Sequence, residues 1–166
     1  MVSPAKICEQ VRISRHLVSR DMDIYGAWPM KFGLFSRRRS RWMLFFYLLF
    51  TVHTFPSVFL FRLQTFFYDC GFPPIATTIS RINHIVFGVT IGNHVRTSGG
   101  LIIAHGHVVL DGWTRLGDNV KIGANAVVVD DIPANHTAVG APARSFPTQK
   151  AGNKFEEGPQ LPGEDA

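Results

Sequence analysis

The chain has 166 residues, enough for one domain with extensions. Of its 17 basic and 12 acidic residues, nine basic and three acidic ones lie in residues 1–41, a net of +6, which leaves −1 for residues 42–166. The body is nearly neutral, which argues against a nucleic-acid-binding domain, because such a domain carries its positive charge on the folded unit. Hydrophobic residues make up 46% and charged residues 17% of the chain, which excludes a largely disordered protein.

The two ends of the chain differ in composition from its centre. Residues 1–41 are polar and basic, and we expect an irregular, partly disordered leader. Residues 147–166 are rich in Pro, Gly, Glu and Gln and cannot bury enough apolar surface to fold, so we expect a disordered tail. No small-residue cleavage site follows an early apolar stretch, so a cleaved secretory signal is not expected.

Residues 42–81 are apolar and aromatic, and we expect them to be helical and associated either with a membrane or with the protein body. The first 20 of them, 42–61, contain no Asp, Glu, Lys or Arg and follow the basic sequence RRRSR. That length can span a bilayer, but Pro56 breaks or kinks a helix, and dense aromatic residues suit a membrane interface. Three arrangements stay open: an interfacial helix steered to anionic lipid, a buried helical cap, and a span.

Residues 82–146 repeat with a period of six. The recurring aliphatic residues are Ile85, Ile91, Leu110, Leu116, Ile122 and Val128. The register slips at the sequence HGH, directly after Ala104. A hexapeptide period is typical of a β-solenoid, in which each short strand turns one corner and three hexads close one triangular coil. Gly, Asn and Asp between the aliphatic positions suit the corners, and about nine hexads predict about three coils.

The stretches GGLIIAHGHVV, LGDNVKIGANAVV and DIPANHTAVGAPAR resemble the hexapeptide-repeat acyltransferases, most closely their serine-acetyltransferase-like branch. The resemblance covers residues 81–146. It implies a mainly β fold, namely a short left-handed parallel β-helix of about three coils preceded by a helical region. It also implies acetyl-CoA as co-substrate, no metal, a small-molecule or saccharide acceptor and a homotrimer.

His105, in the stretch GGLIIAHG, matches the family's catalytic histidine. The resemblance implies that it is the general base that accepts the proton of the acceptor hydroxyl, a role that suits imidazole because it titrates near neutral pH. His107 lies two residues later, and on a strand it would point to the same face as His105. Three roles stay open for it: a partner or substitute for His105, a member of a metal pair, or a turn residue. Asp111 is a candidate partner, since Thr90 stands where the family has its orienting aspartate.

The coenzyme A site is expected along the last repeats. Gly123, Ala124 and Ala141 are small where the family lets the cofactor lie close to the backbone, and Lys121 and Arg144 carry charges that suit phosphate oxygens. One or two coils that the family has between its GDNV and IGAGAVV repeats are missing from this sequence, which weakens L-serine as the acceptor.

The sequence therefore predicts an acetyl-CoA-dependent O-acetyltransferase acting on serine or a saccharide, with His as general base. Because the thioester donor is cytosolic, we expect the protein in the cytoplasm, at the inner face of the cytoplasmic membrane if it is membrane-associated. Two other functions stay open. IAHGHVVLDG also resembles the γ-class carbonic anhydrases, which bind zinc through histidines, and a catalytically inactive solenoid scaffold fits the shortened repeat.

Overall fold

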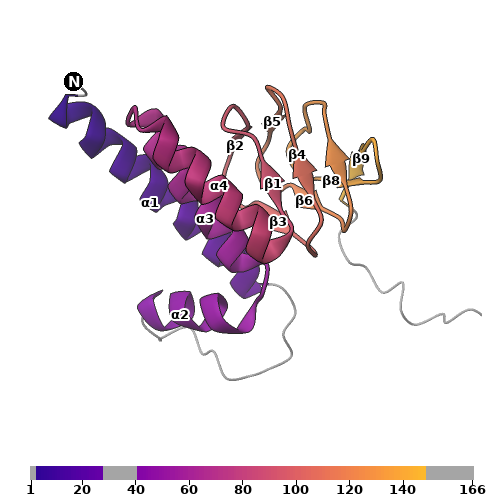
Figure 1. The fold of residues 1–166 in the computed structure, drawn as a ribbon. Helices are drawn as coiled ribbons and strands as arrows, with labels where there is room; N and C mark the ends of the chain where they lie inside the picture. The colour runs from indigo at the N-terminus through magenta and orange to yellow at the C-terminus, as the bar shows by residue number, and fades with distance from the viewer. Residues whose placement is uncertain (1–2, 28–40, 149–166) are drawn as a thin grey trace, which may run out of the picture.

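The structure, a computed structural model, describes residues 3–27 and 41–148. Helices come first and strands follow, and Figure 1 shows the helices gathered at one end of the β part. The helices are α1 (Pro4–Ala27), α2 (Arg41–Thr51), α3 (Phe55–Asp69) and α4 (Pro73–Phe87). The helical region predicted ahead of the repeats is thus confirmed.

The β part consists of very short strands. Within the described ranges they are β1 (Thr90–Ile91), β2 (Arg96–Thr97), β3 (Ile102–Ile103), β4 (Val109–Leu110), β5 (Arg115–Leu116), β6 (Lys121–Ile122), β7 (Val127–Val128), β8 (His136–Val139) and β9 (Arg144–Pro147). From β1 to β7 each strand begins six residues after the start of the preceding strand, except that β4 begins seven residues after the start of β3. The predicted period is confirmed, and the predicted slip at HGH is this one extra residue.

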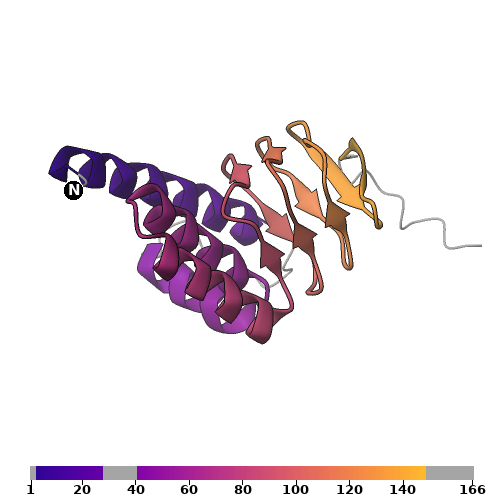
Figure 2. The same cartoon turned by 45° about the horizontal axis from the view of Figure 1, so that its top comes forward.

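Strands from successive turns of the chain pair in parallel, as the stacked arrows of Figure 2 show. One sheet has the order β1-β4-β7, a second pairs β2 with β5, and a third has the order β3-β6-β8 with β9 added antiparallel at its edge. In register, Ile91 pairs with Leu110 and Leu110 pairs with Val128. Equivalent hexapeptide positions therefore lie directly above one another.

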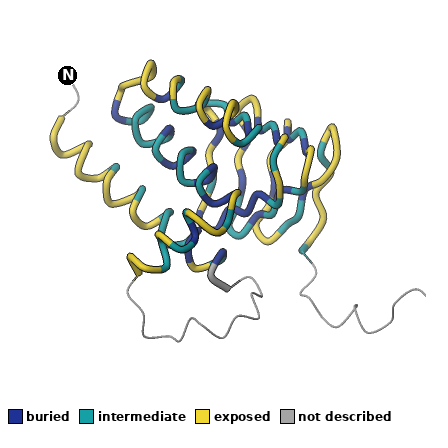
Figure 3. The backbone as a smooth tube through the Cα atoms, turned by 60° about the horizontal axis from the view of Figure 1, so that its bottom comes forward, coloured by how far each residue is buried: buried dark blue, intermediate teal, exposed yellow. Residues whose placement is uncertain are grey.

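The repeated aliphatic side chains form the interior of the β part. Ile91, Leu110, Leu116, Ile122 and Val128 are all buried. Burying one such side chain is worth about 1.5–3 kcal/mol, so the stacked column is a main source of stability. Figure 3 shows the buried positions recurring along the strands, with exposed positions at the corners.

The repeats begin later than the sequence predicted. Ile85, taken as the first aliphatic position, is 79% exposed on α4 rather than buried in a coil. The helix continues to Phe87 and ends where Gly88 takes the left-handed conformation at φ 66°. The boundary predicted at residue 82 was therefore wrong by about two helical turns, because the apolar spacing of α4 imitates a hexapeptide position.

The break between α2 and α3 is the one that Pro56 predicts. Pro56 lies in the first turn of α3, where its missing N–H has no helical partner to lose. Among the residues that the structure describes, no single helix is long and apolar enough to cross a bilayer; α2 and α3 pass that test together, but they are bent by 111°.

The leader is more ordered than its composition indicated. Residues 4–27 form the long helix α1, which corrects the expectation of an irregular segment. Its C-terminal half packs on the body through Asp21, Met22 and Tyr25, which are buried at helical spacing. Residues 28–40, which contain most of the basic run, and residues 149–166 of the predicted tail lie outside the described residues.

A buried ion pair joins α1, α3 and the first turn of the β part. The Arg62 guanidinium donates to both carboxylate oxygens of Asp21, at 2.8 and 3.1 Å, and their side chains are only 3% and 2% exposed. Arg62 also donates to the hydroxyl and carbonyl of Thr97 and to the carbonyl of Ser98. Asp21 in turn accepts the backbone N–H groups of residues 100 and 101. Nearly every polar atom of the pair is thus satisfied.

Candidate active site

The HGH sequence forms the corner between β3 and β4. The backbone N–H of Ala104 donates to the carbonyl of Ile122 at 2.9 Å, so the corner is anchored to the next turn of the chain. A side chain on Gly106 would lie 2.6 Å from the carbonyl oxygen of Phe87, so the corner packs closely against the end of α4. The extra residue in this hexad lengthens the corner and places both histidines outside the strands.

His105 is exposed and faces a histidine from the helical region. The rings of His53 and His105 stack with their centroids 5.8 Å apart and their planes 24° from parallel. His53 lies in the short connection between α2 and α3. The sequence alone assigned His53 no role, although a lone histidine in a charge-free stretch is the signal that could have found it.

His107 does not share a strand face with His105. Its φ of 61° is left-handed, so the alternation assumed for a strand does not apply, and its side chain lies over Gly88 at the end of α4. Among the described residues, no hydrogen bond or ring contact joins the two histidines. The predicted same-face arrangement was wrong because the inserted residue turns the backbone.

Asp111 lies at the next corner, after β4. Its carboxylate accepts the backbone N–H of Gly112 at 2.7 Å, and within the described ranges it makes no hydrogen bond or ion pair with either histidine of the HGH corner. Thr90, at the position of the family's orienting aspartate, lies 2.9 Å from Nδ1 of His84 instead. The structure thus brings His53, rather than either of these residues, against His105.

A cavity of about 290 Å³ opens beside this corner. Its lining residues are His53, Thr54, Ser57, Val86, Phe87, Val89 and Gly106. The hydroxyl of Ser57 is buried without a hydrogen-bond partner among the described residues. An unsatisfied hydroxyl in a cavity wall can still hydrogen-bond to a ligand or a water molecule.

A short chain of polar contacts joins α1 to β3 and to the wall of this cavity. The backbone N–H of Ile103 donates to the Tyr25 hydroxyl at 3.1 Å, and that hydroxyl lies 3.5 Å from the Thr54 hydroxyl. Burial is the main cause that raises the pKa of Tyr25 above its ordinary value of 10.0. The neighbouring Asp21 carboxylate adds to this rise, while the contacts to Thr54 and Ile103 oppose it.

Most of the residues expected to hold coenzyme A lie on the same corner column as His105. Gly123 follows β6 directly and its N–H donates to the carbonyl of Ala138 in β8. Exposed Ala124 and Ala141 follow β6 and β8 at the equivalent corners of the later turns. Arg144 begins β9 and pairs with Val139 at the end of β8. Four of the five predicted residues thus lie at or beside one corner.

Lys121 is set apart from this group. It lies within β6, in register with Ile102 on one side and Thr137 on the other, and is half-buried. Its backbone is therefore part of the third sheet rather than of the corner.

Trp113 lies on the surface of the β part. It is 77% exposed and stacks on His94, with ring centroids 4.1 Å apart. His94 also contacts the ring of Tyr68 on α3 at a centroid distance of 5.5 Å. The tryptophan is thus linked to α3 through His94.

Comparison with known proteins identifies relatives over part of the chain. A serine acetyltransferase of Helicobacter pylori is 41% identical over 70 residues, which are 37% of this chain and 40% of that protein. The galactoside O-acetyltransferase of Escherichia coli is 41% identical over 58 residues, 35% of this chain and 25% of that protein. The predicted resemblance is confirmed. The match spans well under half the length of these relatives, and no protein-family model matches the chain.

Solved structures show the same fold over most of the chain. A serine acetyltransferase from Brucella abortus superposes with a TM-score of 0.56 at 18% identity, covering 80% of this chain and 68% of that one. The Brucella enzyme in complex with coenzyme A gives a TM-score of 0.50 at 19% identity, covering 85% and 70%. The likeness therefore covers more of the chain than the repeats alone.

The residue types of a metal centre are not gathered at this corner. Among the described residues of the single chain, no group of three or more His, Cys, Asp or Glu side chains comes together in a way that could hold a metal ion.

Proposed function

We propose that the protein is an acetyl-CoA-dependent O-acetyltransferase in which His105 is the general base. The observation that carries this proposal is the corner column: His105 and four small or basic residues of the family's cofactor motif lie along one edge of the β part. The relatives that match about a third of the chain are acetyltransferases of serine and of galactoside, which supports the same chemistry. The fold we propose is the left-handed β-helix of about three coils.

Small side chains along the proposed cofactor edge would give room to a pantetheine arm. Ala124 and Ala141 are exposed and carry only a methyl group, so an extended ligand can approach the backbone along this edge. Gly123 has no room for a side chain, since an added Cβ would lie 2.6 Å from Val139. Arg144 is exposed at the end of the column, where its charge suits a phosphate group. These residues would hold coenzyme A, which brings the activated acetyl group.

The proposed reaction is a direct transfer. The imidazole of His105 accepts the proton of the acceptor hydroxyl while the oxygen attacks the thioester carbonyl. The carbon–sulfur bond then breaks, the acetyl ester forms, and the leaving thiolate of coenzyme A takes the proton from the His105 imidazolium. A backbone N–H of the corner would stabilise the oxyanion of the intermediate. His53 would hold the His105 ring in position by stacking, in place of the family's aspartate.

The acceptor would enter through the cavity beside the corner. About 290 Å³ is enough for serine or for part of a monosaccharide, and the hydroxyls of Thr54 and Ser57 lie in its wall. A saccharide is favoured over serine because the coils that complete the serine site of the family are missing from this sequence. Exposed Trp113 and Val139 on the β part would be covered in a homotrimer, whose mass sedimentation analysis can measure.

The proposal is tested by the release of free thiol from acetyl-CoA in the presence of hydroxyl acceptors. We expect His105→Ala to lower the rate by about 100-fold or more, the usual loss for a general base. His136→Ala is the matched control, because His136 lies at the start of β8, where Nδ1 of its ring is 2.9 Å from the carbonyl of Ala134. An unchanged rate in His105→Ala would remove that residue from the mechanism. A wild-type protein that neither binds coenzyme A nor releases thiol would instead be a scaffold.

A further inference from the structure

Helix α2 has two apolar faces, and only one of them is used within the chain. Leu48 is buried, and Phe45 and Tyr47 pack partly buried against the core. The opposite face carries the exposed side chains Trp42, Met43, Phe46 and Phe50, at 72%, 50%, 52% and 83% exposure. At about 100° per residue these four fall within one 100° arc. A contiguous exposed apolar face of this kind marks a site of interaction.

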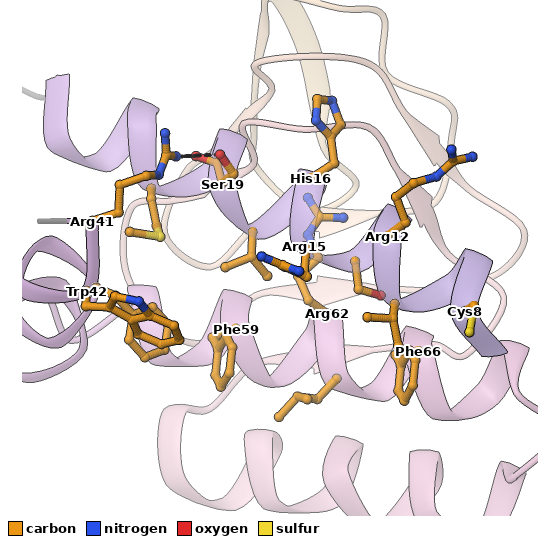
Figure 4. A pocket seen from close by; sticks show the side chains of 16 residues that line it. Cys8, Arg12, Arg15, His16, Ser19, Arg41, Trp42, Phe59, Arg62 and Phe66 are labelled. Atoms are coloured by element: carbon orange, nitrogen blue, oxygen red, sulfur yellow. Dashed lines mark hydrogen bonds between the residues drawn. The ribbon is translucent and has the colours of Figure 1, made fainter.

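A groove continues this face towards α1. A cavity of about 1080 Å³ lies between α1, α2 and α3, with Trp42 at its edge (Figure 4). Met22, Phe59 and Phe66 are among its apolar lining residues. Arg12 and Arg15 from α1 and Arg41 from α2 also line it, so the groove combines an apolar floor with basic groups.

The charge of this groove is positive and weakly compensated. No Asp or Glu is among its lining residues in the described part of the chain. Arg12 pairs with Glu9 at 3.4 Å and Arg41 with Asp23 at 3.3 Å, both at exposed positions. Arg15 has no ion-pair partner among the described residues. Exposed pairs contribute at most about 1 kcal/mol, so the two paired arginines can exchange their carboxylates for phosphate groups.

We propose that α2 lies in the interface of an anionic phospholipid bilayer, with headgroup phosphates at the three arginines and an acyl chain along the groove. Exposed Trp and Phe side chains suit the boundary between headgroups and acyl chains. Basic residues next to them attract anionic lipid. The bend of 111° between α2 and α3 fits a helix that lies on the surface, since a straight span would need the two in line.

A second copy of the chain is a poorer occupant of the same face. In a two-fold pair each surface meets its own copy, so the arginines of one subunit would face those of the other. Lipid phosphates supply the opposite charge. One consequence rests on the proposed function: His53 follows α2 by two residues, so docking through α2 would hold the His105 corner near the bilayer surface.

The test is co-sedimentation of the full chain with vesicles of phosphatidylcholine alone and of phosphatidylcholine with 30% phosphatidylglycerol. We expect binding to the anionic vesicles that weakens as salt increases. The double variants Phe46→Ser/Phe50→Ser and Arg12→Glu/Arg15→Glu should each bind at least tenfold more weakly. Their controls are Ile85→Ser and Arg81→Glu on exposed positions of α4, which should bind within twofold of the wild type.

Four results would overturn the proposal. The wild type could ignore both kinds of vesicle, or bind both equally. The double variant of α2, Phe46→Ser/Phe50→Ser, and that of α1, Arg12→Glu/Arg15→Glu, could each bind as well as their α4 controls. The Phe46→Ser/Phe50→Ser variant could also change the sedimentation mass in the absence of vesicles, which would mean that a second copy covers the face. Because coenzyme A binding is measured without vesicles, none of these results bears on the proposed transferase activity.

Discussion

The buried pair of Arg62 and Asp21 provides a demanding test of how the helices are attached to the β part. Arg62→Ala removes the guanidinium but leaves the Asp21 carboxylate 2% exposed, with only the N–H groups of Gly100 and Leu101 as donors. Removing one partner of a buried pair costs about 3–5 kcal/mol, because the remaining charge is left without its counter-charge. We therefore expect about 4 kcal/mol of lost stability.

The matched control is the exposed pair of Arg96 and Asp69. Its nitrogen and oxygen are 2.9 Å apart, against 2.8 Å in the buried pair, but the Arg96 side chain is 43% exposed. Arg96→Ala should cost at most about 1 kcal/mol. The two variants thus compare the same chemical change at similar distance and different burial.

The measurement is denaturant unfolding of both variants and the wild type at one protein concentration. A double variant, Arg62→Met with Asp21→Leu, should lose less stability than the sum of the two single changes, because neither charge is then left alone. Equal losses for Arg62→Ala and Arg96→Ala would refute the reasoning that burial makes this pair essential to the docking of α1.

Three further predictions concern the corners and the site. Gly117→Ala should cost about 3 kcal/mol in denaturant unfolding, because its Cβ would lie 2.4 Å from the backbone nitrogen of Ala134. The control Gly92→Ala, whose Cβ would have no contact under 3.4 Å, should cost about 1 kcal/mol or less. Equal costs would contradict the close packing of the turns. Burial raises the Tyr25 pKa above 10.0, so the neutral phenol contributes to the free energy of unfolding below pH 10. The wild type should lose this contribution as the pH rises further, because the tyrosine of the unfolded chain ionises at lower pH than that of the folded protein. Tyr25→Phe should abolish this loss of stability above pH 10. If stability falls with pH in the variant as steeply as in the wild type, the result would argue against the role of Tyr25. His53→Ala should lower the acetyl-transfer rate by roughly tenfold with little effect on stability, whereas a wild-type rate would show that the ring stack does not position His105.

The repeat region could be predicted closely because its physics is local. A period of six with buried aliphatic residues determines the strands, their parallel stacking and the position of the register slip. The positive-φ corners at Asn119 and Asn125 follow from residue type as well, since asparagine tolerates this conformation better than most residues do. The error at Ile85 shows the limit, because one apolar residue fits both a helix and a hexapeptide position.

The contacts between the helices and the β part could not be predicted in this way. Asp21 and Arg62 are 41 residues apart in the sequence. From the sequence alone each is expected to be an ordinary charged surface residue, because only the fold brings the two together and buries them. The same holds for His53, which meets His105 only because Pro56 bends the chain between α2 and α3. The left-handed turn at His107 depends on one inserted residue, which changes the direction of a side chain that strand geometry would place elsewhere.

The most direct test of the central claim is equilibrium binding of coenzyme A to the full chain, measured by calorimetry and by the shift in thermal unfolding. We expect saturable binding, with a stabilisation of about 2.7 kcal/mol at 100 times the dissociation constant. Ala124→Trp should abolish the shift while leaving the unliganded protein as stable as the wild type, since residue 124 is exposed on the proposed cofactor edge. Absence of saturable binding at millimolar coenzyme A, or wild-type binding by Ala124→Trp, would contradict the account.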